Sequence, residues 1–289
     1  MVVILGVDVP PDLVELWCGW LAPDPQPFIV GTDARWQELE GDSGVITPEL
    51  RDTFRLWAVA PGSQLLWLSD ERFHGLPKPV RASLVREQVT RRSGNPPGVG
   101  GVPSVRGWRD LLDPTALRRE ADGHRFVWWP GLVATDPIGI LDRLLSADRL
   151  PSRHAEVSNS VWRRCEDILP NAQAVAGTWP QGSSSCCFST VMTAAGSDDS
   201  GACDSVEPFG EWLDSACRKG GNLSDAGTVL VWRDRDGLPV HAAVAIGEGW
   251  GLEKPSQEWH SPHAVATISD IIRTTRLPGQ RLEKHTILP

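Results

Sequence analysis

The chain has 289 residues, which is long enough for two modest domains. Its hydrophobic residues (40%) and charged residues (22%) occur at the levels of an ordinary globular protein. The net charge of −9 argues against nucleic acid, or an anionic membrane surface, as the main partner.

The N-terminal sequence and the cysteines indicate a cytoplasmic protein without a bound metal. The first apolar run has no basic region before it and breaks at Asp8–Pro11, so we expect no signal peptide, and no run is long enough to span a membrane. The cysteines form no CxxC pair and have no suitably spaced histidine, so we expect reduced thiols, no zinc and no other cofactor. They are Cys18, Cys165, Cys186, Cys187, Cys203 and Cys217.

Residues 1–150 predict an N-terminal α/β domain of unknown role, on which a protein partner could dock. Its Gly- and Pro-rich segment Ser93–Pro103 does not have the spacing of a phosphate-binding loop. The expected elements are a strand at Val2–Val7, a helix from Pro11, a strand within Gln26–Trp36, a hairpin at Phe54–Ser69, a helix at Pro79–Arg92, two short helices in Ser104–Ala121, a strand or aromatic core segment at His124–Pro130 and a helix at Asp136–Ser146.

A boundary is expected at Leu150–Ser152, so that residues 151–289 form a second domain. Helices are predicted at Ser158–Leu169 and Pro208–Cys217. A polar loop is predicted at Ser197–Asp204, just before the second of these helices. A last strand and a short closing helix or turn are expected within 263–276.

The segment Gly182–Gly196 predicts a buried helix that carries Cys187 in its first turn. Ser184 and Ser185 are candidate N-caps, and Gly196 suits the position after the helix. The helix dipole and the unpaired N–H groups at a helix start favour the thiolate, which is the form that attacks a carbonyl. The alternative is that Cys187 is simply a small core residue.

Two β-hairpins downstream predict the partners of the thiol. Gly227–Asp234 and Val240–Gly247 are β-rich runs joined by a turn with an Asp-Gly pair, and a second turn leads into Trp250–Ser256. If that second turn were a two-residue loop, Glu253 would point away from His241.

A three-residue loop at 247–249 gives the other register. Ala243 then faces Glu253, and His241 is a diagonal neighbour of Glu253 on the same sheet face. The glycine at the third loop position favours this register. We therefore predict Cys187 as nucleophile, His241 as general base and Glu253 as the acid that orients the imidazole.

These motifs resemble those of the NlpC-type papain-like cysteine peptidases. The matching segments are CFSTV at Cys187–Val191, GTVLVW at 227–232, HAAVAIG at His241–Gly247 and EKPS at Glu253–Ser256. In that family a helix-starting cysteine precedes a strand, then a strand that begins with a histidine, then a polar third residue twelve positions after the histidine, which is where Glu253 falls. The resemblance covers about residues 152–289 and implies an α+β papain-like domain with helices on an antiparallel sheet.

Three departures from the family pattern bear on the substrate. The family's aspartate before the cysteine is Cys186 here, the glycine two positions after it is Ser189, and the chain has no tyrosine to grip the free amine of a murein peptide. We therefore expect a neutral amide or ester rather than murein. Its predicted binding residues, all apolar or neutral, are Trp250, Ser256 and Trp259.

The expected function is that of a cysteine-dependent amide hydrolase, a peptidase or amidase acting on a small-molecule or peptide amide through a thioester. One alternative is an acyltransferase, in which an amine rather than water resolves the thioester. Another is a non-catalytic interaction module with an unreactive thiol. A disulfide between Cys186 and Cys187 would switch an active thiol off.

Overall fold

The computed structural model of the protein describes residues 2–91, 98–119, 123–197 and 205–288. Residues 198–204 of the predicted loop at 197–204, with Cys203, and part of the predicted loop at 93–103 lie outside these ranges. The chain forms two compact units, one of Pro11–Leu144 and the other of Met1–Pro10 with Leu145–Pro289.

This division differs from the predicted one at residue 150. The first ten residues belong with the C-terminal unit because they form a small hairpin, β1 (Val2–Ile4) and β2 (Val7–Val9), whose turn is bonded to it. The backbone N–H of Ser152 donates to the carbonyl oxygen of Leu5 over 2.7 Å. The predicted single strand at 2–7 is broken because Leu5 and Gly6 both have positive φ, of 51° and 74°.

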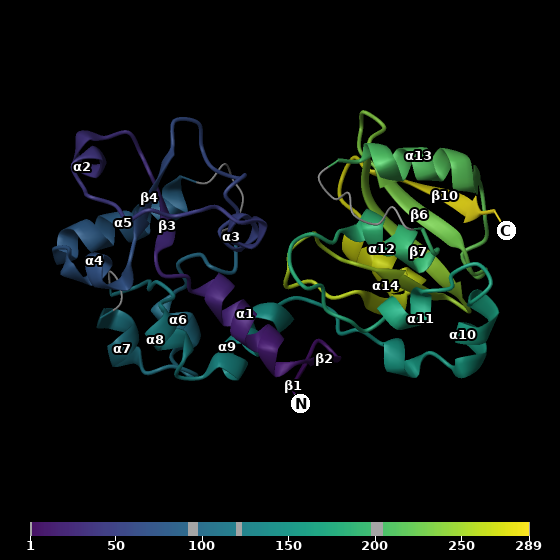
Figure 1. Ribbon diagram of the computed structural model, residues 1–289, viewed down its shortest axis with the longest axis horizontal. Coiled ribbons are helices and arrows are strands. Elements are labelled where there is room, and N and C mark those ends of the chain that lie inside the picture. Colours follow the sequence, from purple (N-terminus) through teal and green to yellow (C-terminus); the bar gives the residue numbers. More distant parts are fainter. Residues whose placement is uncertain (1, 92–97, 120–122, 198–204, 289) are drawn as a thin grey trace. The chain divides into compact units, whose positions relative to one another are not determined.

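The unit of Pro11–Leu144 contains a two-stranded antiparallel sheet and short helices (Figure 1). The strands are β3 (Gln26–Val30) and β4 (Gln64–Leu68). The helices are α1 (Pro11–Leu21), α2 (Ala34–Gln37), α3 (Pro48–Thr53), α4 (Asp70–Gly75), α5 (Lys78–Thr90), α6 (Val105–Trp108), α7 (Pro114–Arg119), α8 (Pro130–Val133) and α9 (Pro137–Ser146), the last of which crosses the division between the units.

The predicted hairpin at Phe54–Ser69 does not form. Only its second half is a strand, β4, and this strand pairs with β3 from a distant part of the sequence. The five residues of β3 are all buried. Pairing of β4 with this buried strand is therefore favoured over the local hairpin that the turn residues predict. The first half instead continues the end of α3 in turns, with Arg55 at a φ of 44°.

Aromatic side chains form much of the core of this unit, as expected for the segment at 124–130. The ring of Phe73 lies 5.5 Å from that of Phe28 and 5.3 Å from that of Trp129. The rings of Trp108 and Trp128 meet edge to face at 4.8 Å.

The C-terminal unit is built on a six-stranded antiparallel sheet with the order β5-β10-β6-β7-β8-β9 (Figure 1). The strands are β5 (Cys217–Lys219), β6 (Thr228–Arg233), β7 (Pro239–Gly247), β8 (Trp250–Glu253), β9 (Ala264–Thr267) and β10 (Arg281–Ile287). The helices are η1 (His154–Glu156), α10 (Asn159–Cys165), α11 (Ala172–Val175), α12 (Cys187–Ala194), α13 (Glu207–Ala216) and α14 (Ile268–Thr275). Helices on antiparallel sheets confirm the predicted α+β class.

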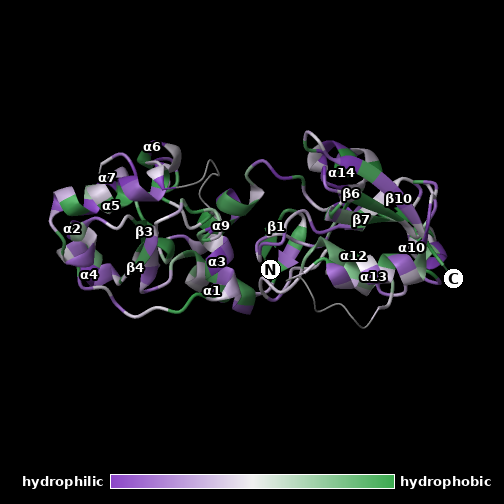
Figure 2. Ribbon diagram, turned by 90° about the horizontal axis from the view of Figure 1, so that it is seen from above, coloured by the Kyte–Doolittle hydropathy of each residue, from purple (hydrophilic) through white to green (hydrophobic). Residues whose placement is uncertain are grey.

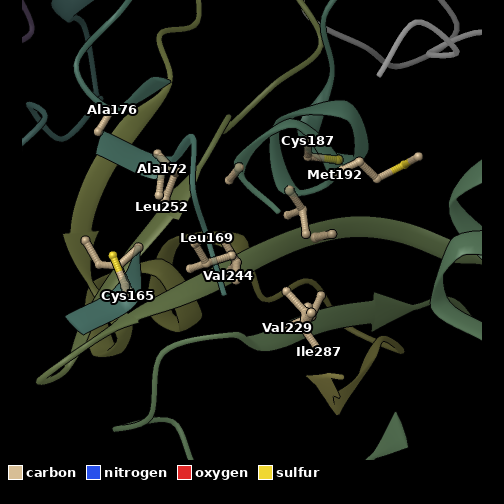
Figure 3. Packing of buried hydrophobic residues seen from close by; sticks show 14 of the residues in the cluster. Cys165, Leu169, Ala172, Ala176, Cys187, Met192, Val229, Val244, Leu252 and Ile287 are labelled. Atoms are coloured by element: carbon tan, nitrogen blue, oxygen red, sulfur yellow. The ribbon is translucent and has the colours of Figure 1, made fainter. Parts of the chain in front are cut away.

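Helices cover both faces of this sheet. On one face, Val229, Val231 and Val244 form a core with α10, α12 and α13. Figure 3 shows α12, with Cys187 and Met192, lying over the strands that carry Val244 and Leu252. The alternate residues of the strands face α14.

The second face packs Leu230, Trp232 and Ala243 against Ile268 and Ile271 of α14. In Figure 2 the ribbon of α14 alternates between hydrophilic and hydrophobic residues, as a helix that covers a sheet must. Because both faces are covered, β6 and β7 are almost continuously apolar.

Among the described residues, no helix is both long and apolar enough to cross a membrane.

Candidate active site

The helix α12 begins at Cys187, which is therefore its first residue, as predicted. Its N-cap is Cys186 rather than Ser184 or Ser185. The backbone N–H of Cys186 donates to the hydroxyl of Ser189 over 2.9 Å, and that reciprocal bond defines the helix start. Gly196, with a φ of 78°, follows the helix end, as expected for a glycine in the left-handed region.

The two adjacent cysteines are both free thiols. Both are buried, and the Cys187 side chain is 8% exposed. Of the two cysteines, Cys187 is the one that interacts with the imidazole of His241.

His241 and Glu253 lie side by side on neighbouring strands. Nε2 of His241 is 3.0 Å from Oε2 of Glu253, and the two residues are 8% and 5% exposed. A carboxylate only accepts hydrogen bonds, so the imidazole donates from Nε2. The structure thus brings the two residues together from positions twelve apart in the sequence.

The register that joins them is the predicted one, but the turn that produces it is not. Ala243 pairs with Glu253, as expected for a three-residue loop. The turn, however, has two residues rather than three, because Gly247 pairs with Trp250. The register then shifts between Ala245 and Gly247. The extra residue of this β-bulge, at position 246, restores the parity that a two-residue turn alone would have reversed.

The turn itself has the backbone of a tight hairpin. Glu248 and Gly249 have φ values of 50° and 81°, which is the pattern of a type I′ turn. Sequence parity alone could not distinguish this turn plus a bulge from a longer loop.

The side chain of Cys187 also interacts with the imidazole of His241 and favours its charged form. Nε2 of the imidazole is engaged by Glu253. Burial opposes a charge on the imidazole. Hydrogen bonds to Cys187 and Glu253, and the negative charge of both partners, outweigh burial and raise the pKa of His241 to about 10.

Trp232 is a site residue that the sequence analysis did not single out. It pairs with His241 across β6 and β7, and its ring meets the imidazole at 5.2 Å and 62°. Trp232 is 1% exposed, so it shields one side of the imidazole from water. The Asp-Gly turn between these strands was the available signal, because it sets which residue of β6 faces His241.

The loop after Glu253 is held by a buried lysine. Nζ of Lys254, which is 0% exposed, donates to the carbonyl oxygens of Ser256 (2.6 Å) and Glu258 (2.8 Å). A buried ammonium group that is well bonded fixes the path of this loop, and with it the end of β8.

The predicted substrate-binding residues do not gather at the imidazole. Trp259 is completely buried against the ring of His260, so it is not available to a substrate. Ser256 is tied into its own turn, where its backbone N–H donates to Ser261. Trp250 lies at the far end of β8 from Glu253, where the guanidinium of Arg153 stacks on its ring.

A cavity of about 400 Å³ lies beside the imidazole instead. His241 and Glu253 form part of its wall, whereas Cys187 is not among its lining residues. The signal for it in the sequence is weak, because its other lining residues come from several segments that lie far apart in the chain.

A second imidazole holds the segment that precedes Cys187. Nδ1 of His263 is 2.9 Å from the hydroxyl of Thr178, and Nε2 is 3.0 Å from the hydroxyl of Ser185. Burial and the charge of Lys254 lower the pKa of His263 to about 4, so this imidazole is neutral at pH 7. A cavity of about 310 Å³ at this point is lined mainly by serine and threonine residues.

Within the described parts of the chain, no group of three or more histidine, cysteine, aspartate or glutamate side chains is arranged to hold a metal ion. No family model, curated protein or solved structure matches the chain.

Proposed function

We propose that the protein is a cysteine-dependent amide hydrolase of the papain-like, NlpC-type class. The observation that carries this proposal is the buried pair of His241 and Glu253, 3.0 Å apart, together with the interaction of His241 with Cys187 at the start of α12. The helix that starts at a cysteine and packs on an antiparallel sheet supports the class. The substrate is an amide of a small molecule or peptide.

The pKa of about 10 for His241 supports an imidazolium at neutral pH, and this imidazolium is the proposed proton donor. The sulfur of Cys187 bonds to the carbonyl carbon of the amide. As the C–N bond breaks, the imidazolium gives its proton to the nitrogen of the leaving amine. Water then attacks the thioester and gives its proton to the neutral imidazole. The C–S bond breaks, and a carboxylic acid leaves.

The start of α12 supplies a donor for the negative charge on the carbonyl oxygen. The first N–H that bonds within the helix is that of Thr190, to the carbonyl oxygen of Cys186. The N–H of Cys187 lies before it, in the first turn, where a helix has no internal acceptor. This N–H is the proposed oxyanion donor.

Alkylation with iodoacetamide at pH 7 tests the proposal, with peptide mapping to assign each modified thiol. We expect Cys187 to react at least tenfold faster than Cys165 and Cys217, whose thiol pKa values are raised by burial, that of Cys217 to about 12. Cys186→Ser is the matched control and should leave the rapid phase intact, whereas Cys187→Ala should abolish it.

Equally slow reaction of all the thiols would contradict a catalytic site. That result would favour the alternative of a non-catalytic interaction module.

An acyltransferase is the second candidate, and the cavity beside His241 favours it, because an acceptor amine could occupy the place of the leaving amine. Mass spectrometry of the acyl-enzyme, with and without added amine, separates the two. Hydrolysis predicts the same rate of thioester loss in both cases. Transfer predicts faster loss with the amine and a new amide product.

A further inference from the structure

The exposed lining of the cavity beside His241, its mouth, includes three large apolar residues among polar ones such as Asp148 and Thr274. Leu150, Val240 and Leu277 line it, and all three are exposed, by 44%, 41% and 59%. Large exposed apolar side chains that line one cavity, rather than scattering over a surface, indicate a site for an apolar ligand.

The buried lining of the cavity, its floor, includes two small apolar residues as well as His241 and Glu253. Ala264 and Ala266, on the edge strand β9, line it and are 6% and 7% exposed. Their small side chains leave the space that a larger residue would fill. The volume of about 400 Å³ lies within the range of about 300–1,000 Å³ that small-molecule pockets occupy.

The position of the cavity relative to the reacting groups indicates which part of the substrate it binds. Its wall contains His241 and Glu253 but not Cys187. In cysteine hydrolysis the acyl group becomes bound to the sulfur, whereas the amine departs from beside the imidazole that protonates it. A cavity on the imidazole side therefore receives the amine.

We infer that this cavity binds the amine side of the substrate, and that this amine carries an aliphatic chain. The assignment of the cavity to the amine side rests on the proposed function. The presence of an apolar binding site does not depend on that function. The substrate is then an N-alkyl amide, and an acceptor of acyl transfer would likewise be an alkyl amine.

Two isomeric amides test the orientation. N-hexylacetamide carries its chain on the amine, and N-methylheptanamide carries a chain of the same length on the acyl group. The wild-type protein should release hexylamine from N-hexylacetamide and methylamine from N-methylheptanamide. We expect kcat/KM for N-hexylacetamide to be at least tenfold higher. Equal values, or the reverse order, would overturn the inference.

Binding to the Cys187→Ala protein tests the cavity without any chemistry. Calorimetry should show tighter binding of N-hexylacetamide than of N-methylacetamide, by about threefold to fourfold for each methylene group that is buried. Ala266→Leu should remove this gain by filling the floor. If that variant does not fold, Val240→Ser at the mouth should weaken the gain instead.

The matched control is Leu282→Ser on β10, which is 36% exposed and is not a lining residue, and it should leave binding unchanged. Absence of a chain-length gain in the Cys187→Ala protein would remove the cavity as a binding site. If the gain is present but neither amide is turned over and the thiol is slow to alkylate, the proposed function fails while the apolar site stands.

Discussion

At the scale of single residues, His241 is bonded to Glu253 and interacts with Cys187, and Trp232 covers the imidazole. The contact between His241 and Glu253 is a charged hydrogen bond of 3.0 Å between two buried groups. Such a bond orients an imidazole firmly, because each partner would be costly to bury alone.

Glu253→Gln should lower kcat by about tenfold to a thousandfold and leave the fold intact, because the orienting member is the least indispensable of the three. The pKa of His241, measured by NMR, should fall as the carboxylate charge is lost. Glu283→Gln on β10, which removes a carboxylate bonded to Arg233, is the matched control and should change neither value. An unaltered kcat in Glu253→Gln would refute the assignment.

The same ion pair should appear in the dependence of stability on pH. The pKa of His241 is about 10 in the folded protein, against about 6.5 in an unfolded chain. A raised pKa contributes stability fully below about pH 6.5, and this contribution is lost as the pH rises through about 10. The difference in unfolding free energy between the wild type and Glu253→Gln should therefore narrow between these pH values.

Urea unfolding at pH 6.5, 8 and 10 measures that difference. A gap that widens with rising pH would be inconsistent with a protonated imidazole in the folded state.

At the scale of elements, the site depends on the hairpin of β7 and β8 and on the loop that follows it. The bulge at residue 246 sets which residue of β8 faces Ala243. Lys254 then fixes the chain immediately after Glu253. The position of the carboxylate is thus determined from both sides.

Lys254→Met should destabilise the protein by about 2–3 kcal/mol, because the carbonyl oxygens of Ser256 and Glu258 lose a buried donor. Urea unfolding gives this value. Lys219→Met, at an exposed position on β5, is the control and should cost less than about 0.5 kcal/mol. Equal effects of the two substitutions would show that the buried ammonium group does not hold the loop.

At the scale of the whole molecule, the chain is acidic and contains no tyrosine. A net charge of −9 does not attract the anionic stem peptides of murein. We expect no cleavage of muropeptides with a free N-terminal L-alanine, even at high protein concentration, in an assay that follows release by mass spectrometry. A neutral N-alkyl amide in the same assay is the positive control. Cleavage of the D-glutamyl bond of a murein tripeptide would reverse the substrate assignment.

The sequence alone was sufficient for the α+β class and for Cys187 at a helix start. The pairing of Ala243 with Glu253 was also predicted, but from a three-residue loop, whereas a two-residue turn and a bulge produce it. These predictions rest on local physics, namely helix capping, turn chemistry and the two-residue period of a strand. Each can be evaluated within a short segment. The catalytic role of the three residues stays a prediction.

The tertiary structure decided the features that depend on contacts between distant parts of the chain, namely strand pairing, burial and the cavity. The predicted hairpin at Phe54–Ser69 was wrong because β4 pairs with β3, and the first ten residues joined the C-terminal unit through Ser152. Likewise, Trp259 is buried, and the cavity beside His241 is assembled from separate segments. Burial and cavities arise only when segments that are far apart in the chain exclude water together, and no local pattern records which segments will meet.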